Sequence, residues 1–278
     1  MNMDARNDQL RTAKADFYLT VAQAFMVPME LSGAAAMLCG DLAADLAELD
    51  QEIGYGLADE IAACQHDFDL VGHPDELLLI YSSLFIAPPR RVQINAATYL
   101  DGAFNGGSVA ELEACYALGG AARAEKFRDL ADHVALQLEF IAHLYSSIGV
   151  EPTPGQFIDR FPARWIDPLI DDMERATAEL GMSANPYLGL ARILRKALAN
   201  DAEREIRPLT PTERRERALA LARHKEAERG ISAADYEEMR RRLTERGLST
   251  EHLAADRDPA DDPLAGWKPM TPPAPRPR

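Results

Sequence analysis

Histidine and carboxylate residues spaced four apart are the first candidates for chemistry in this sequence. Asp129 precedes His133 and Glu139 precedes His143, a spacing that places both members of a pair on one face of a helix. Di-iron bundles need a Glu-x-x-His step on each of two helices together with further glutamates. Both pairs lie in one segment, and the sequence contains no Glu-x-x-His step. Solvated or capping polar residues are therefore the simpler interpretation.

Motifs of the common catalytic and nucleotide-binding sites are missing from the sequence. It contains no P-loop, no G-x-G-x-x-G after a strand, no G-x-S-x-G and no H-E-x-x-H. Cys39, Cys64 and Cys115 are odd in number and widely separated, so they predict neither a disulfide framework nor a zinc site. We expect them to be small buried hydrophobes. The sequence predicts a protein that is not an enzyme and holds no metal or cofactor.

Polar side chains nevertheless gather on one face of an apolar segment that is expected to be helical. If that face is buried, these groups must hydrogen-bond to one another or to a ligand, because unsatisfied burial costs roughly 1–3 kcal/mol per group. A second interpretation has the aspartate complementing the helix dipole in the first turn and the first histidine satisfied in the core. The residues concerned are Asp132, His133, Gln137, Glu139 and His143.

Helical patterns account for most of the first 200 residues. Residues 90–107, rich in glycine and asparagine, interrupt them and are expected to form a loop. A low aromatic content of 7% together with abundant alanine and leucine also favours helices over strands. The fold class is predicted to be all-α, as one helical bundle. The expected helices cover residues 8–26, 28–50, 57–67, 74–85, 108–119, 126–149, 162–180 and 185–200.

Charge divides the chain into two parts. The net charge is -15, and residues 1–200 hold 14 Lys and Arg against 29 Asp and Glu, whereas residues 201–278 hold 16 of each. A field of that sign repels nucleic acid and attracts basic ligands or peptides, although solubility alone is the simpler explanation of the charge. Residues 204–250 are expected to form a charged helical hairpin, and the Pro- and Asp-rich residues 251–278 to be disordered.

Hydrophobic stretches are too short for a membrane location. No run approaches the roughly 20 apolar residues of a membrane-spanning helix, and the first residues show no hydrophobic signal-peptide core. We expect the protein to lie in the cytoplasm.

Several segments resemble one chaperone family in their order and spacing. Residues 132–144 are similar to the D-H-x-x-x-E-L-x-F-x-x-x-L signature of the TorD/DmsD family, which is related to the NarJ group. Upstream, Tyr81-x-x-Leu84-Phe85-x-x-Pro88 resembles the family's aromatic-x-x-L-F-x-x-P motif. Residues 99–101 stand where the family has the Y-L-D step, and residues 115–119 resemble its Y-x-x-x-G step. The resemblance covers residues 10–202, but Gln137 replaces the glutamate of the signature.

The resemblance implies a maturation chaperone with a TorD-like all-helical domain over residues 1–203. Such proteins bind the twin-arginine signal peptide and the apo catalytic subunit of a molybdopterin oxidoreductase until its cofactor is inserted, as a monomer or dimer. Asp132 would pair with a cation of the peptide, directly or through His133, and the 90–107 loop would form a movable wall. The client-binding residues so implied are Tyr81, Leu84, Phe85, Pro88, Tyr99, Asp132, His133, Gln137 and Glu139.

Two alternatives stay open. Tyr81, Leu84 and Phe85 fit ordinary core packing equally well. The whole chain also fits a non-catalytic structural or assembly subunit of an oxidoreductase complex, which would remain stably bound to the purified enzyme.

Overall fold

The structure is a computed structural model that describes residues 3–28, 41–71, 73–88, 90–102, 104, 106–122, 124, 127, 129–205 and 241. Within this part of the chain the secondary structure is helical, with one isolated bridge between Asn95 and His133 and no strand. The predicted all-α fold is confirmed. No helix of the described residues is long and apolar enough to cross a membrane.

Contacts divide the chain into two units, residues 1–222 and residues 223–278. The described helices belong to the first unit, apart from the single residue Arg241. The predicted hairpin over residues 204–250 lies outside the described residues except at its first two residues and Arg241, and the predicted disordered segment, residues 251–278, lies wholly outside them.

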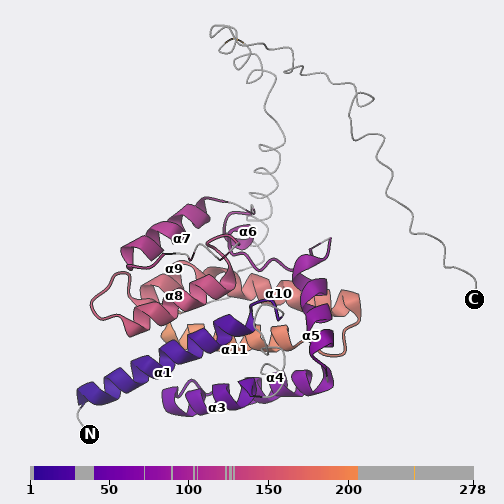
Figure 1. Ribbon diagram of the computed structural model, residues 1–278, viewed down its shortest axis with the longest axis horizontal. Helices are drawn as coiled ribbons and strands as arrows, with labels where there is room; N and C mark the ends of the chain where they lie inside the picture. Colours follow the sequence, from indigo (N-terminus) through magenta and orange to yellow (C-terminus); the bar gives the residue numbers. More distant parts are fainter. Residues whose placement is uncertain are drawn as a thin grey trace, which may run out of the picture. The chain divides into compact units, whose positions relative to one another are not determined.

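Helix α1 runs through the middle of the first unit (Figure 1). It packs against α8, α3 and α11, and α11 packs in turn against α4, α10 and α9. The helices are α1 (Met3–Ala24), α3 (Leu42–Ile53), α4 (Ala58–Val71), α5 (Pro74–Tyr81), the π-helical turn η1 (Ser82–Ile86), α6 (Ala97–Leu100), α7 (Gly107–Leu118), α8 (Val134–Ser146), α9 (Pro154–Arg160), α10 (Pro162–Leu180) and α11 (Pro186–Asp201).

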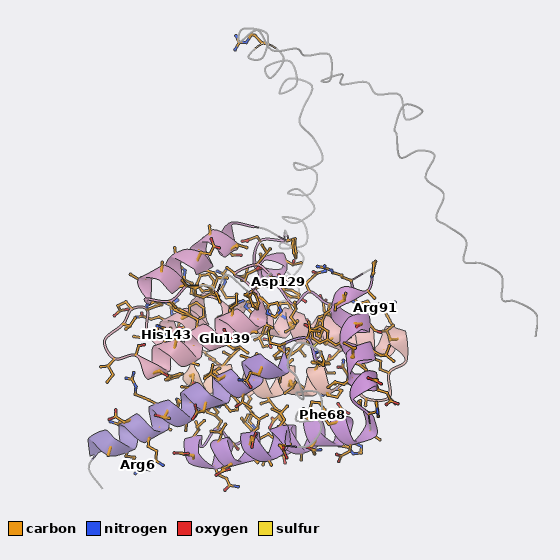
Figure 2. All side chains as sticks on the ribbon, viewed as in Figure 1. Arg6, Phe68, Arg91, Asp129, Glu139 and His143 are labelled. Carbon is orange, nitrogen blue, oxygen red and sulfur yellow. The ribbon has the colours of Figure 1, made fainter. Side chains whose placement is uncertain are left out.

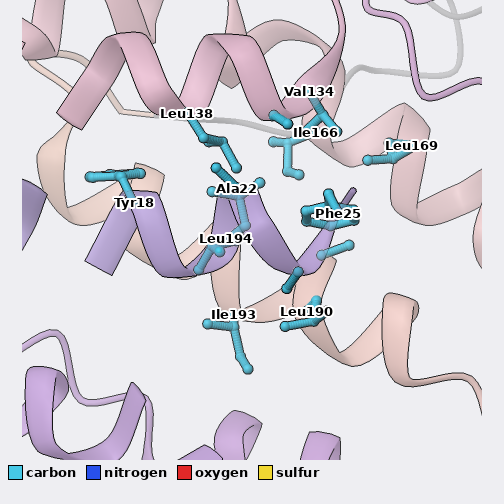
Figure 3. Packing of buried hydrophobic residues seen from close by; sticks show 14 of the residues in the cluster. Tyr18, Ala22, Phe25, Val134, Leu138, Ile166, Leu169, Leu190, Ile193 and Leu194 are labelled. Carbon is cyan, nitrogen blue, oxygen red and sulfur yellow. The ribbon is translucent and has the colours of Figure 1, made fainter. Parts of the chain in front are cut away.

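Apolar side chains from four of these helices meet in the core, as Figure 3 shows. Tyr18 and Ala22 of α1 and Phe25, the residue directly after this helix, recur at helical spacing and are fully buried. Burial of each large apolar side chain stabilises the fold by about 1.5–3 kcal/mol, so packing in this cluster stabilises the position of each helix that contributes to it. The partners of α1 in the view include Val134 and Leu138 of α8, Ile166 and Leu169 of α10, and Leu190, Ile193 and Leu194 of α11.

Most predicted helices are confirmed, and the capping residues explain their ends. Asn185 opens α11 by accepting a hydrogen bond from the Leu188 amide, 3.3 Å away, with Pro186 in the first helical position. Helix α10 has the predicted bounds. Of the helix predicted over residues 28–50, residues 29–40 lie outside the described residues. Helix α9 was not predicted, although its Thr153 and Gln156 form a capping box.

Two predictions about the fold are wrong. Residues 90–107, expected to form a loop, contain the short helix α6, and the helix expected over residues 126–149 begins only at Val134. The two residues before it are engaged with a distant loop. The Asp132 carbonyl accepts from the Ala96 amide at 3.0 Å, and the Val134 amide donates to the Ile94 carbonyl at 3.1 Å. Asp132 therefore does not share a helical face with Glu139, because this pairing fixes its backbone outside the helix.

The predicted helix over residues 74–85 widens at its end into the π-helical turn η1. There the Ala87 amide donates to the Ser82 carbonyl at 2.7 Å, five residues back. The Leu84 carbonyl accepts from the Val92 amide at 3.1 Å, so the chain after η1 is held beside it. Such turns are frequent at functional sites. Here the turn brings Tyr81 and Phe85 to the same side of the element, against the cleft described next.

Candidate binding cleft

A cleft of about 670 Å³ opens between η1, the chain after α1, the loop that precedes α8 and α8 itself. Two of its lining residues are labelled in Figure 2, where Asp129 lies near the start of α8 and Glu139 lies further along that helix. Apolar side chains dominate its lining, and its charged groups are two carboxylates and one arginine. The lining residues are Met26, Val27, Tyr81, Phe85, Ile86, Arg90, Ile94, Asn95, Ala122, Ala124, Phe127, Asp129, His133, Leu136 and Glu139.

Tyr81 and Phe85 form the apolar floor of the cleft. Their ring centroids are 4.9 Å apart, and both rings also contact Tyr187, at 5.4 and 5.6 Å. Only 3% and 5% of their surfaces are exposed. They are therefore core residues whose outer edges face the cleft, so each of them both packs in the core and lines the cleft. Ile86, at 48% exposed, offers the most accessible large apolar surface in this part of the cleft.

His133 caps α8 and faces the cleft at the same time. Its Nδ1 accepts a hydrogen bond from the Ala135 amide at 3.1 Å, so the neutral ring carries its proton on Nε2. Burial lowers the pKa of His133 to about 4, although the nearby Asp129 carboxylate acts in the opposite direction. The ring also meets Phe127 edge-on at 5.5 Å. At neutral pH this residue is an uncharged N–H donor beside the cleft.

Asp132 is turned away from the cleft and is fully buried. Its carboxylate accepts from the Ala97 amide at 2.8 Å and from the Asn95 side chain at 3.1 Å. Burial raises the pKa of this carboxyl, and these hydrogen bonds act against the shift. The carboxylate holds residues 95–97 against the start of α8. Because it is enclosed, the carboxylate does not reach the cleft directly, which leaves contact through His133 as the other route that the resemblance implied.

The contacts of Gln137 explain why this chain has an amide where the family signature has a glutamate. The side chain is fully buried, its Nε2 donates to the Asp132 carbonyl at 2.7 Å, and its Oε1 accepts from Trp165 Nε1 at 3.0 Å. The amide thus joins the loop before α8 to α10 and uses both of its ends in doing so. An ionised glutamate at this position would lack the donor for the carbonyl.

The other predicted residues support the cleft or lie beside it. Leu84 is fully buried in the core, and Pro88 is exposed near the end of η1 without lining the cleft. Tyr99 donates to Asp172 at 3.2 Å and accepts from the Gln93 amide at 3.2 Å, so it joins the loop to α10. Four of the nine predicted residues line the cleft directly: Tyr81, Phe85, His133 and Glu139.

Asp129 lines the cleft, although its spacing to His133 in the sequence indicated only a possible metal ligand. Its carboxylate accepts from the Asn95 side chain at 3.2 Å and from the Leu130 amide at 2.6 Å, and the residue lines the cleft. Its spacing four residues before His133 was the available signal. Among the described residues no group of three or more metal-ligating side chains occurs. Cys64 and Cys115 are buried and free, as predicted, while Cys39 lies outside the described residues.

Glu139 is exposed on α8, opposite the floor of the cleft. The protein around it partly desolvates the carboxylate, which raises the pKa of Glu139. Among the described lining residues, Asp129 and Glu139 are the two carboxylates and Arg90 is the one cation. The Arg90 guanidinium lies 5.8 Å from the Phe104 ring. The described polar lining is therefore acidic on balance.

Comparison with protein families gives one match. Residues 38–171 match the model of the family described as the nitrate reductase delta subunit. The matched segment contains all nine predicted binding residues and ends within α10, but it does not include Met26 and Val27. Curated proteins and solved structures give no match.

Proposed function

Residues 38–171 belong to the nitrate reductase delta subunit family of molybdoenzyme maturation chaperones, and we propose that the chain binds its client's signal peptide in the cleft. The relationship predicted from the sequence motifs is thereby confirmed. In this proposal the client is the apo catalytic subunit of a molybdopterin oxidoreductase with a twin-arginine signal peptide. The chain acts in the cytoplasm, without catalysis of its own, while cofactor is inserted.

The apolar and acidic lining of the cleft supports this proposal. A twin-arginine signal peptide presents two neighbouring cations followed by an apolar stretch. An apolar floor beside acidic groups is the complement of such a segment. Tyr81, Phe85 and Ile86 supply the first property, and Asp129 and Glu139 supply the second. The net charge of -15 would attract the basic end of the peptide over a longer range.

Each predicted residue then has a defined role in the proposal. Tyr81 and Phe85 contact the apolar stretch, and the Nε2–H of His133 donates to the peptide. Asp132 and Gln137 act indirectly, because they fix the loop before α8 and residues 95–97 on either side of the cleft. Leu84 and Tyr99 stabilise the same walls, and Pro88 lies beside the cleft near the end of η1.

Ile86→Asp is the sharpest test of the cleft, because this side chain is already 48% exposed and its replacement spares the core. Leu79 lies on α5, seven residues earlier, is 66% exposed and does not line the cleft, so Leu79→Asp is the matched control. The probe is a fluorescently labelled synthetic peptide with an Arg-Arg pair followed by an apolar helix-forming stretch. Fluorescence anisotropy measures its affinity for the full chain.

We expect the parent and Leu79→Asp to bind this peptide equally well, and Ile86→Asp to bind it at least tenfold more weakly. Loss of half of an isoleucine's apolar contact is worth about 1 kcal/mol, and the desolvation of a carboxylate adds to this. Circular dichroism melts check that both variants fold. No binding by the parent, or equal losses in the two variants, would contradict the proposal.

A further inference from the structure

A second, smaller pocket of about 200 Å³ adjoins the cleft along α8. The two hollows share Ala122, Leu136 and Glu139. The smaller one has less than a third of the volume of the cleft, so it fits one long side chain and not a length of backbone. A peptide that lies in the cleft can therefore place a single residue in this pocket.

Hydrogen-bond acceptors are the polar groups that two residues of α8 bring to this pocket. Glu139 contributes a carboxylate. Nε2 of His143 lies 2.8 Å from the Gly119 carbonyl oxygen. Because a carbonyl can only accept, the His143 ring carries a proton on Nε2, and its Nδ1 is an acceptor in the neutral form. Figure 2 shows the two side chains one turn apart along the helix. A ligand that suits this pocket donates hydrogen bonds and is positively charged.

Aromatic rings form the base of the pocket. The Tyr116 and Phe140 centroids are 4.8 Å apart, and both residues are almost wholly buried. The Tyr116 hydroxyl donates to the Ala131 carbonyl at 2.8 Å, which leaves the ring rather than the hydroxyl for a ligand. Phe140 also stacks on His143, with centroids 6.0 Å apart. Aromatic faces attract cations, and a planar guanidinium stacks on them better than an ammonium does.

Gly119 maintains this shape. A Cβ atom at this position would lie 2.6 Å from the Phe140 ring, so only glycine lets that ring pack against the end of α7. The carbonyl of the same residue orients His143. The aromatic base of the pocket therefore depends on glycine at this position, whereas the orientation of the imidazole depends only on the backbone carbonyl.

We propose that this pocket binds one arginine side chain of the client segment in the cleft, and that Glu139 selects it. The guanidinium donates to the Glu139 carboxylate and lies over the aromatic base, with His143 as a second acceptor. The inference rests on the proposed function for the source of the arginine, but the chemistry of the pocket stands without it.

The first test combines protein and peptide substitutions. The Arg-Arg peptide is compared with two versions in which one arginine is replaced by glutamine, each against the parent and Glu139→Gln. Glu179→Gln is the control. Glu179 is an exposed residue of α10 that lines neither the cleft nor the pocket, so this substitution removes the same charge at a different place. We expect Glu139→Gln to weaken binding of the Arg-Arg peptide about tenfold. It should leave unchanged the binding of the peptide that lacks the arginine held in this pocket, because that contact is already lost. Equal losses for all three peptides, or an equal effect of Glu179→Gln, would overturn the inference.

The second test does not need a peptide. N-acetyl-arginine amide is titrated into the full chain, and the ring signals of His143 are followed by NMR, with N-acetyl-lysine amide as the comparison. The inference predicts saturable shifts at millimolar concentrations that are larger for arginine and are lost in Glu139→Gln. Absence of any shift would overturn it even if the peptide binds. Shifts without peptide binding would instead refute the proposed function and leave the pocket's specificity supported.

Discussion

Gln137→Glu restores the residue of the family signature, and the structure predicts that it destabilises this chain at neutral pH. The parent amide donates to the Asp132 carbonyl and accepts from Trp165 in a site without solvent contact. A protonated carboxyl group can reproduce both hydrogen bonds, but an ionised one cannot make the first. The variant must therefore either bind a proton on folding or bury a charge opposite a carbonyl oxygen.

The cost of binding a proton sets an upper limit on this destabilisation. An ordinary glutamate has a pKa of about 4.3, and each pH unit above it costs about 1.4 kcal/mol when the group must be protonated. The limit is thus about 3.7 kcal/mol at pH 7 and about 1 kcal/mol at pH 5. The introduced group has a raised pKa in the folded state, so the folded chain binds more protons than the unfolded one. Stability must then fall as the pH rises from 4 to 7.

Urea unfolding followed by circular dichroism at pH 5 and pH 7 measures the effect. The free energy of unfolding is compared with that of the parent at each pH, which cancels the titration of the other groups. Gln9→Glu, at an exposed position of α1, is the control and should change stability by less than about 0.5 kcal/mol. A Gln137→Glu chain as stable as the parent at pH 7, or a loss that is the same at both pH values, would refute the reasoning.

Three further predictions concern the surroundings of the cleft. Asp132→Ala leaves the buried Ala97 amide without its acceptor, so the free energy of unfolding should fall by about 1–3 kcal/mol, with faster hydrogen exchange of that amide; unchanged values would contradict its positioning role. His133, with its pKa lowered to about 4, should show no titration between pH 5 and 8 by NMR, and stability should decrease as the pH falls from about 6.5 to 4; a midpoint near 6.5 would be incompatible with its burial. Gly119→Ala forces the Phe140 ring to move and should cost about 1–3 kcal/mol in a thermal or urea unfolding experiment, whereas no loss would show that the ring has room.

Helix positions followed closely from the sequence because local signals agreed with the final packing. Asn185 and Pro186 mark the start of α11 by their own chemistry, and Pro162 and Gly181 bound α10. The start of α8 was mispredicted for a non-local reason. Residues 132–134 pair with residues 94–96, about 38 positions away, and no periodicity within residues 126–149 carries information about that partner.

The cleft itself was predictable only in part. The motif that contains Tyr81 and Phe85 indicated an apolar surface, and the structure places both side chains on the floor of the cleft. A sequence does not show whether a carboxylate points outward or back onto its own backbone, so Asp132 was expected to face a ligand. It caps a loop instead, and Asp129, three residues earlier, faces the cleft.

The polar residues around α8 fall into two groups according to these contacts. Residues with their polar atoms satisfied internally, Asp132 and Gln137, fix the geometry. Residues whose polar atoms border the hollows, His133 and Glu139, are those we expect to contact a client. Substitutions in the first group should alter stability and binding together, whereas Glu139→Gln should alter binding alone.

Photo-cross-linking of the Arg-Arg peptide tests the central claim most directly. A benzophenone group is placed in the peptide's apolar stretch, the complex with the full chain is irradiated, and the modified residues are located by mass spectrometry. Binding in the cleft predicts adducts on its accessible apolar lining, at Met26, Val27 or Ile86. Adducts that fall instead on exposed apolar residues outside the cleft, such as Leu79 or Ile148, would contradict the claim.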